Sequence, residues 1–184
     1  TANEAIYASS QAEGDSGDLM GTTLVAAVLR GKYATIASVG DSRAYLVRAN
    51  ALTQITRDHS QVEAEVASGR LSAADAKRDP RRNILTHALG QKPKLDTKLP
   101  EIFELTLLPQ DRLLLCTDGF YDVIEDREYV RTLLEFDPSA AAKQLITMAV
   151  ERGTTDNVSA VVVEALPTRV QAQILQEVPA GRGG

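Results

Sequence analysis

The stretch DRLLLCTDGF, residues 111–120, places an apolar run of strand character directly before an aspartate and a glycine. Two more stretches repeat this arrangement, VGDSR at residues 39–43 and GTTDNVSAVVV at residues 153–163. Apolar, β-branched runs of this length are typical of buried strands. A carboxylate at the end of a buried strand is costly unless a cation meets it. The sequence therefore predicts a cation site at the three aspartates of these stretches.

The donors in these stretches favour a particular kind of metal. Asp41, Asp118 and Asp156 offer hard oxygen ligands, which suit Mg²⁺ or Mn²⁺. The chain has one cysteine and two histidines, so it offers little for zinc or copper. A bound Mg²⁺ or Mn²⁺ polarises a phosphoryl oxygen and makes a bound water nucleophilic at neutral pH. The pattern therefore favours phosphate hydrolysis, although any one of these aspartates alone is more typical of an ordinary turn or helix cap.

Composition narrows the class of protein. The 184 residues are 43% hydrophobic and 24% charged, which predicts one soluble globular domain, and no apolar run approaches the ~20 residues that span a bilayer. The net charge of -5 argues against nucleic acid or anionic membrane as a partner, despite a local basic patch at Arg78, Arg81 and Arg82. The lone Cys116 cannot form an internal disulfide, and no signal segment is evident. We expect a cytoplasmic protein.

Hydrophobic periodicity predicts an α+β fold. Strands are expected at residues 20–30, 33–39, 44–48, 54–57, 102–108, 113–116 and 158–165, with another apolar run at 84–89. Helices are expected at residues 3–11, 61–68, 72–77, 126–134 and 139–152. Strands grouped into hairpins with helices elsewhere indicate mostly antiparallel sheet, with roughly eight strands and four to five helices. We expect one domain over residues 1–166 and a tail or linker over 167–184, with an appended helix at 168–178.

Six segments in order carry a family resemblance. They are MGTT (20–23), VGDSRAY (39–45), TRDHS (56–60), NILTHALG (83–90), DRLLLCTDGF (111–120) and GTTDNVSAVVV (153–163). Over Met20 to Val163 the chain resembles the metal-dependent serine/threonine protein phosphatases of the PPM or PP2C family, of bacterial type. The resemblance implies an α-β-β-α sandwich of largely antiparallel sheets flanked by helices. It also implies hydrolysis of phosphoserine and phosphothreonine by direct attack of a metal-activated water, with no covalent intermediate.

The resemblance assigns roles at individual positions. Asp118 and Asp156 match metal ligands of a centre with two Mn²⁺ or Mg²⁺ ions, and Asn157 matches the neighbour of the latter. Asp41 matches an aspartate that helps hold a third, weaker ion. Gly119, which can adopt unusual backbone angles, is expected to let the chain turn sharply away from the metal. The nucleophile is expected to be the metal-activated water, and no side chain is expected to be catalytic.

Two family motifs have no counterpart in these residues. One contains a phosphate-gripping arginine and a Glu-Asp pair, and the other is a D-G-x-G-G segment whose aspartate bridges both metals. Because the later motifs are all present in order, truncation at the N-terminus explains this absence better than degeneration does. We expect the 184 residues alone to be inactive or nearly so.

Several other residues invite functional interpretations that the sequence does not favour. The segment from His59 to Leu89 corresponds to the family's flap beside the active site. His59 and His87 are each more typical of a packed structural histidine than of a catalytic acid. Cys116 lacks the arginine of a C-x5-R phosphatase loop, since Asp122 occupies that position, and we expect a core cysteine. No P-loop motif occurs, which disfavours nucleotide triphosphate hydrolysis.

Three functions remain open from the sequence. The first is a phosphatase acting on a phosphorylated protein, with a cognate Ser/Thr kinase as a further partner. The second is a non-catalytic pseudophosphatase or phosphoprotein-binding regulatory module, against which the retention of three costly carboxylates argues. The third is a phosphatase with a narrow target, such as an anti-sigma-factor antagonist. The sequence does not reveal the oligomeric state, although unpaired sheet edges would favour association.

Overall fold

The structure is a computed structural model, which describes residues 1–12, 20–121 and 123–167. The helices are α1 (Ala2–Ala12), α2 (Gln61–Ala67), α3 (Ala73–Ala76), α4 (Asp126–Glu135) and α5 (Pro138–Glu151), with a short 3₁₀ helix η1 (Asp118–Phe120). The strands are β1 (Leu24–Arg30), β2 (Tyr33–Val39), β3 (Arg43–Arg48), β4 (Ala51–Gln54), β5 (Glu101–Thr106), β6 (Arg112–Cys116) and β7 (Ala160–Glu164). The α+β class predicted from the sequence is confirmed.

The strands form two antiparallel sheets that pack face to face. One sheet has the order β1-β2-β5 and the other the order β4-β3-β6-β7. Ile36 from the first sheet lies in one buried cluster with Ala44 and Leu113 from the second. Alternate positions along these strands therefore face a shared core, as the period of two in a strand requires.

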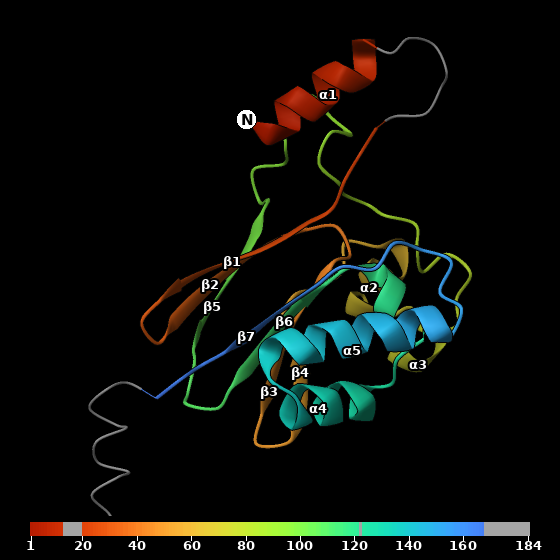
Figure 1. Ribbon diagram of the computed structural model, residues 1–184. Helices are drawn as coiled ribbons and strands as arrows, with labels where there is room; N and C mark the ends of the chain where they lie inside the picture. Colours follow the sequence, from red (N-terminus) through yellow and green to blue (C-terminus); the bar gives the residue numbers. More distant parts are fainter. Residues whose placement is uncertain (13–19, 122, 168–184) are drawn as a thin grey trace, which may run out of the picture.

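Helices α4 and α5 cover the outer face of the four-stranded sheet (Figure 1). Tyr129 and Leu133 of α4 and Leu145 of α5 are almost fully buried against this sheet. The ring of Tyr129 stacks on Tyr45 of β3, with centroids 5.5 Å apart. Burying side chains of this size contributes about 1.5–3 kcal/mol each relative to leaving them exposed. This layer therefore holds β3 and β6 rigidly.

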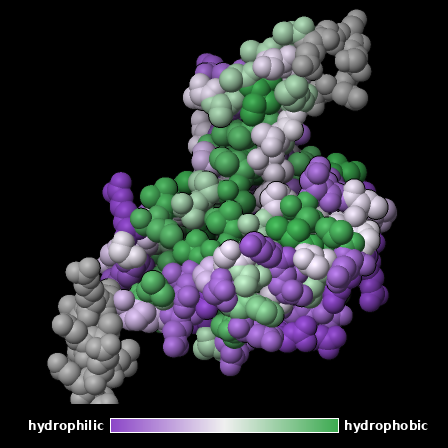
Figure 2. All heavy atoms as spheres, in the orientation of Figure 1, coloured by the Kyte–Doolittle hydropathy of each residue, from purple (hydrophilic) through white to green (hydrophobic). Residues whose placement is uncertain are grey.

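The outer face of the three-stranded sheet is different, because hydrophobic side chains remain exposed on it. Val28, Tyr33 and Ile102 are 58%, 59% and 55% exposed. Figure 2, seen from the side of α4 and α5, shows that hydrophobic residues also gather on the near side over the region of β1, β2 and β5. Among the described residues, the helical layer of the sandwich therefore lies on one side, over the four-stranded sheet.

Helix α1 stands apart from the sheets and contacts the segment around Gly90 (Figure 1). Asn3 is buried, and its side chain accepts a hydrogen bond from Gly90 N–H at 2.9 Å and donates to Lys92 O at 3.0 Å. A Cβ at Gly90 would lie 2.3 Å from Ile6 Cγ2, so only glycine permits this approach. These contacts fix the start of α1.

One predicted strand was wrong in position, and the expected number of roughly eight strands was not reached in the described residues. The strand expected at residues 54–57 lies at Ala51–Gln54, because Ala49 and Asn50 adopt left-handed conformations and reverse the chain within two residues. The apolar run at 84–89 contributes only isolated bridges, so seven strands form within the described ranges rather than roughly eight.

Two further observations bear on the predictions. The helix expected at residues 168–178 lies outside the described residues, as does almost all of the expected tail. Within the described part of the chain, every helix is too short or too polar to cross a membrane.

Candidate metal centre

The three predicted aspartates lie at one end of the sheets. Asp41 follows β2 directly after Gly40, Asp118 begins η1 after β6, and Asp156 lies in the loop before β7. Strands β3 and β6 pair Arg43 with Cys116, and β6 and β7 pair Cys116 with Ala160. This register brings the three loops together, as the sequence predicted for the ends of buried strands.

The carboxylates are close enough to affect each other's ionisation. Burial raises the pKa of Asp118 to about 6, and the negative charges of Asp41 and Asp156 add to this shift. Asp41 is buried, and its pKa is raised first by burial and then by the charge of Asp58. Such crowding of partly buried carboxylates is the condition that a divalent cation relieves.

The aspartates fit a divalent cation in charge and donor type, because hard oxygen ligands suit Mg²⁺ or Mn²⁺. They do not form a finished coordination shell. Across residues 1–12, 20–121 and 123–167, no group of three or more His, Cys, Asp or Glu side chains is arranged to hold a metal ion. These residues therefore supply part of a donor set.

Gly119 supports the centre by close approach and not by an unusual backbone conformation. Its φ does not lie in the left-handed region, so the expected reason for glycine here was wrong. A Cβ at Gly119 would lie 2.8 Å from Val158 Cγ1 and 2.9 Å from Asn157 O. Glycine is needed because η1 packs directly against the loop that carries Asp156.

Asn157 contributes through its main chain. Its N–H donates to Asp156 Oδ1 at 2.6 Å, and its carbonyl accepts from Thr117 Oγ1 at 3.3 Å. Thr154 Oγ1 donates to Gly119 O at 3.0 Å across the same junction. These bonds tie the two aspartate loops to each other and orient the Asp156 carboxylate.

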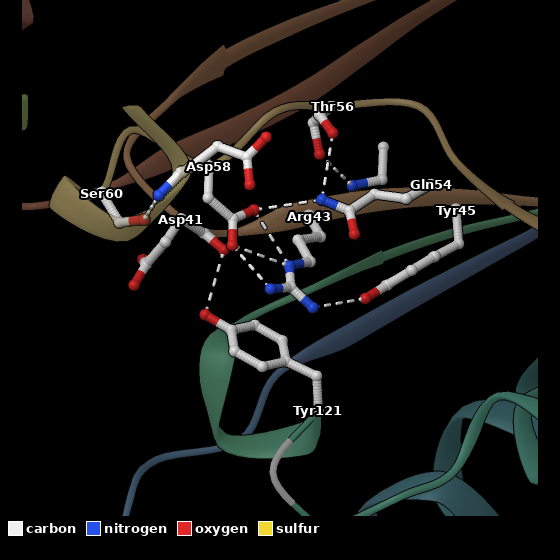
Figure 3. Close-up of polar contacts among 10 residues, drawn as sticks. Asp41, Arg43, Tyr45, Gln54, Thr56, Asp58, Ser60 and Tyr121 are labelled. Atoms are coloured by element: carbon white, nitrogen blue, oxygen red, sulfur yellow. Dashed lines mark hydrogen bonds and ion pairs between the residues drawn. The ribbon is translucent and has the colours of Figure 1, made fainter. Parts of the chain in front are cut away.

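An ion pair that the sequence analysis did not predict lies beside Asp41 (Figure 3). Arg43 donates from Nε and Nη2 to the Asp58 carboxylate at 2.9 and 2.6 Å, and from Nη1 to Tyr45 Oη at 2.9 Å. Its guanidinium carbon lies 3.5 Å from the centre of the Tyr121 ring. The side chains of Arg43 and Asp58 are only 20% and 13% exposed. The only sequence feature that could have indicated this pair is that Arg43 and Asp58 lie in the VGDSRAY and TRDHS segments.

Tyr121 connects this ion pair to Asp41. Its hydroxyl donates to the main-chain oxygen of Asp41 over a long 3.4 Å. Burial, and then the negative charge of Asp41, raises the pKa of Tyr121, so the phenol remains a proton donor. Because Tyr121 follows η1 directly, it links the Asp118 loop to the Asp41 loop.

Cys116 is a core residue, as predicted. It is 2% exposed within the cluster under α4 and α5. Burial raises the pKa of its thiol to about 12, so it remains a neutral thiol at neutral pH. This excludes the activated thiolate that a cysteine phosphatase needs.

The flap segment borders a cleft of about 1090 Å³ beside the ion pair. Its lining includes Arg43, Asp58 and Tyr121 on one side and Lys77 and Arg78 on the flap side. In the neighbouring turn, Arg81 pairs with Asp79 at 2.7 Å and Glu65 at 3.0 Å. The basic patch predicted at Arg78, Arg81 and Arg82 is thus partly neutralised.

Comparison with known proteins decides the family. The model for protein phosphatase 2C matches residues 2–158. The chain belongs to the protein phosphatase 2C family. It is 40% identical over 147 residues to the serine/threonine phosphatase stp of Listeria welshimeri, a match that covers 79% of this chain and 57% of that protein. The chain therefore spans little more than half the length of this relative.

Solved structures of the family agree with the fold. The crystal structure of the Mycobacterium tuberculosis phosphatase PstP superposes with a TM-score of 0.80 at 34% identity, covering 90% of this chain and 68% of that one. Stp1 from Staphylococcus aureus gives a TM-score of 0.80 at 35% identity, covering 90% and 64%. The PstP catalytic domain has also been solved with two manganese ions, with a TM-score of 0.76 at 33% identity, covering 90% and 67%.

Proposed function

We propose that this chain is part of a Mn²⁺- or Mg²⁺-dependent protein phosphatase that hydrolyses phosphoserine and phosphothreonine. The observation that carries the proposal is the convergence of Asp41, Asp118 and Asp156: burial, and then the charges of the other two, raise the pKa of Asp118 to about 6. Family membership and the manganese found in the PstP catalytic domain support it. The substrate would be a phosphorylated protein and the partner a cognate Ser/Thr kinase, in the cytoplasm.

The aspartates would share the task of holding the metal. Asp118 and Asp156 would bind the two-ion centre, and Asp41 would bind a third ion. When bound, such ions supply a water made nucleophilic at neutral pH and polarise a phosphoryl oxygen. Gly119 and Asn157 would keep the Asp118 and Asp156 loops in contact.

Arg43 would have a supporting part in this function. Its guanidinium contacts Asp58, Tyr45 and the ring of Tyr121, so most of its binding capacity is used within the protein. It would instead stabilise the loops that carry the aspartates.

Phosphate release from a phosphothreonine peptide tests the proposal. The assay is run with Mn²⁺ on the full protein that contains these residues, and on the 184 residues alone. We expect turnover by the full protein, loss of turnover in Asp156→Asn, and little change in the exposed control Glu104→Gln. The 184 residues should turn over weakly, because the described residues supply only part of a donor set. A full protein without Mn²⁺-dependent turnover would contradict the proposal.

A non-catalytic binding module is the second candidate, and the lack of a three-ligand group among the described residues favours it. Calorimetric titration with Mn²⁺ separates the two candidates. A phosphatase should bind Mn²⁺ through Asp156, so Asp156→Ala should lose affinity. A binding module should bind a phosphopeptide equally well with and without the metal.

A further inference from the structure

Gly40, the residue directly before Asp41, is held by His59 at both of its main-chain polar groups. Gly40 N–H donates to His59 Nδ1 at 3.1 Å, and His59 N–H donates to Gly40 O at 3.0 Å. Both residues are buried. This pair of hydrogen bonds restrains the peptide groups on both sides of Gly40. Neither its N–H nor its C=O can rotate away without leaving a buried polar atom unpaired.

The conformation of Gly40 determines how Asp41 leaves β2. Its φ is +96°, and a Cβ at this position would lie 2.4 Å from Thr23 Cγ2. Thr23 also shares a hydrogen bond with Ser42, with their hydroxyl oxygens 2.8 Å apart. The chain therefore makes an obligatory glycine turn between β2 and Asp41. The contacts that hold this turn therefore fix the main chain from which the Asp41 side chain leaves.

His59 is itself fixed by its surroundings. Its carbonyl accepts from Thr86 N–H at 2.7 Å, and its ring lies edge-on to His87 with centroids 5.6 Å apart. Its Nε2 faces Glu101 Oε2 at 3.8 Å. Because Nδ1 accepts the Gly40 proton, a neutral ring carries its own proton on Nε2. Burial lowers the pKa of His59, which keeps the ring neutral and Nδ1 available as an acceptor.

We propose that His59 is a positioning residue for Asp41. Its Nδ1 holds Gly40 in the turn, and the turn directs the Asp41 carboxylate toward Asp118. The consequence for metal binding rests on the proposed function, but the hydrogen bond and its effect on Asp41 do not. The sequence predicts a packed structural histidine at His59, and packing alone does not require an acceptor at Nδ1.

Nuclear magnetic resonance on the metal-free 184-residue chain tests the contact. We expect a scalar coupling across the hydrogen bond between Gly40 N and His59 Nδ1 in the wild-type protein. His59→Asn keeps an acceptor at the δ position, whereas His59→Leu has a similar size and no acceptor. The Asp41 amide and carboxyl resonances should move in His59→Leu and stay near their wild-type positions in His59→Asn. His87→Leu, which removes the neighbouring ring but not the bond, should leave them unmoved.

A second measurement tests the consequence. Residues that orient a metal ligand without binding the metal themselves typically change metal affinity by about 10- to 100-fold when they are replaced. Titration of Mn²⁺ into the full protein that contains these residues, followed by electron paramagnetic resonance, should therefore show about tenfold weaker binding in His59→Leu. His59→Asn and His87→Leu should bind as the wild type does. If the full protein that contains these residues binds no Mn²⁺, the proposed function fails, while the Asp41 resonances still decide the role of His59.

Three results would overturn the inference. The first is the absence of the Gly40 to His59 coupling in the wild-type protein. The second is a folded His59→Leu in which the Asp41 resonances do not move. The third is an equal effect of His59→Asn and His59→Leu, which would indicate packing alone. If His59→Leu does not fold, His59→Asn decides the question. The wild-type coupling between Gly40 and His59, together with Asp41 resonances at their wild-type positions in His59→Asn, would support the positioning role. Shifted Asp41 resonances in His59→Asn would contradict it.

Discussion

The guanidinium group of Arg43 contacts Asp58, Tyr45 and the ring of Tyr121. Replacing Arg43 is therefore the strongest test of stability near the candidate centre. Replacing it with methionine keeps the length of the side chain but leaves Asp58 as a poorly solvated charge, since Asp58 is only 13% exposed. Breaking a buried pair in this way costs about 3–5 kcal/mol. We expect the free energy of unfolding of Arg43→Met to fall by about 3 kcal/mol in a urea titration.

An exposed ion pair provides the control for Arg43. Arg81 also pairs with two carboxylates, but its side chain is 43% exposed and solvent screens the interaction. Arg81→Met should therefore destabilise the protein much less than Arg43→Met. Equal losses from the two substitutions would show that the Arg43 pair is no more important than a surface contact.

Asp118 should make the stability of the metal-free protein depend on pH. Its pKa is raised from the ordinary range of an aspartate to about 6, first because of burial and then because of the charges of Asp41 and Asp156. A carboxyl group that binds its proton more tightly in the folded state destabilises the protein once it ionises. Stability should therefore fall as the pH rises from about 4 to about 6. Asp118→Asn should raise the melting temperature in EDTA at pH 7.5 and have little effect near pH 3.5.

Added metal should reverse this difference. Mn²⁺ binds the folded state and raises the melting temperature by mass action, but only where the carboxylates can hold it. We expect Mn²⁺ to stabilise the wild type at pH 7.5 and to have no such effect on Asp118→Asn. The exposed substitution Glu104→Gln should follow the wild type under both conditions. A melting temperature of Asp118→Asn below that of the wild type in EDTA at pH 7.5 would refute the assigned shift.

Between elements, the contact of η1 with the loop before β7 depends on the absence of a side chain at Gly119. A methyl group there would lie within 3 Å of Val158 Cγ1 and Asn157 O, so one loop must move. Overpacking of this kind typically costs about 1–3 kcal/mol. We expect Gly119→Ala to lose stability in this range and to weaken Mn²⁺ binding, as measured by urea unfolding and calorimetry.

A double-mutant cycle separates this clash from other effects of the substitution. Val158→Ala removes Cγ1 and should partly rescue Gly119→Ala, because the contact with Asn157 O remains. Strictly additive effects of the two substitutions would mean that η1 and the Asp156 loop are not in the proposed contact.

Hydrophobic periodicity predicted most of the elements, whereas the contacts between them were not predictable. The β2 strand matches its expected range of residues 33–39, because its apolar pattern and the Gly31 turn both point to the same ends. The β4 strand was misplaced because Ala49 and Asn50 reverse the chain without a typical turn sequence. The three aspartates could be placed from the sequence because each lies at the end of a predicted strand. The Arg43 pair and the His59 contact with Gly40 depend on distant segments meeting, which no local pattern encodes.

At the scale of the whole molecule, the two sheets differ in how their outer faces are covered. The four-stranded sheet is buried under α4 and α5, and its ends carry the candidate centre. The three-stranded sheet exposes hydrophobic side chains on its outer face, and β1 pairs only with β2 among the described strands. Apolar faces and unpaired strand edges both favour association.

The 184-residue chain should therefore self-associate through the three-stranded sheet. We expect its weight-average mass in sedimentation experiments to increase with concentration. The double substitution Val28→Glu and Ile102→Glu should reduce this increase, because it places charges on the exposed face. Leu166→Glu is a matched control, since Leu166 is 73% exposed but lies beyond β7 of the other sheet. Equal relief by the control, or a wild type that stays monomeric at all concentrations, would show that this face does not mediate contacts between copies of the chain.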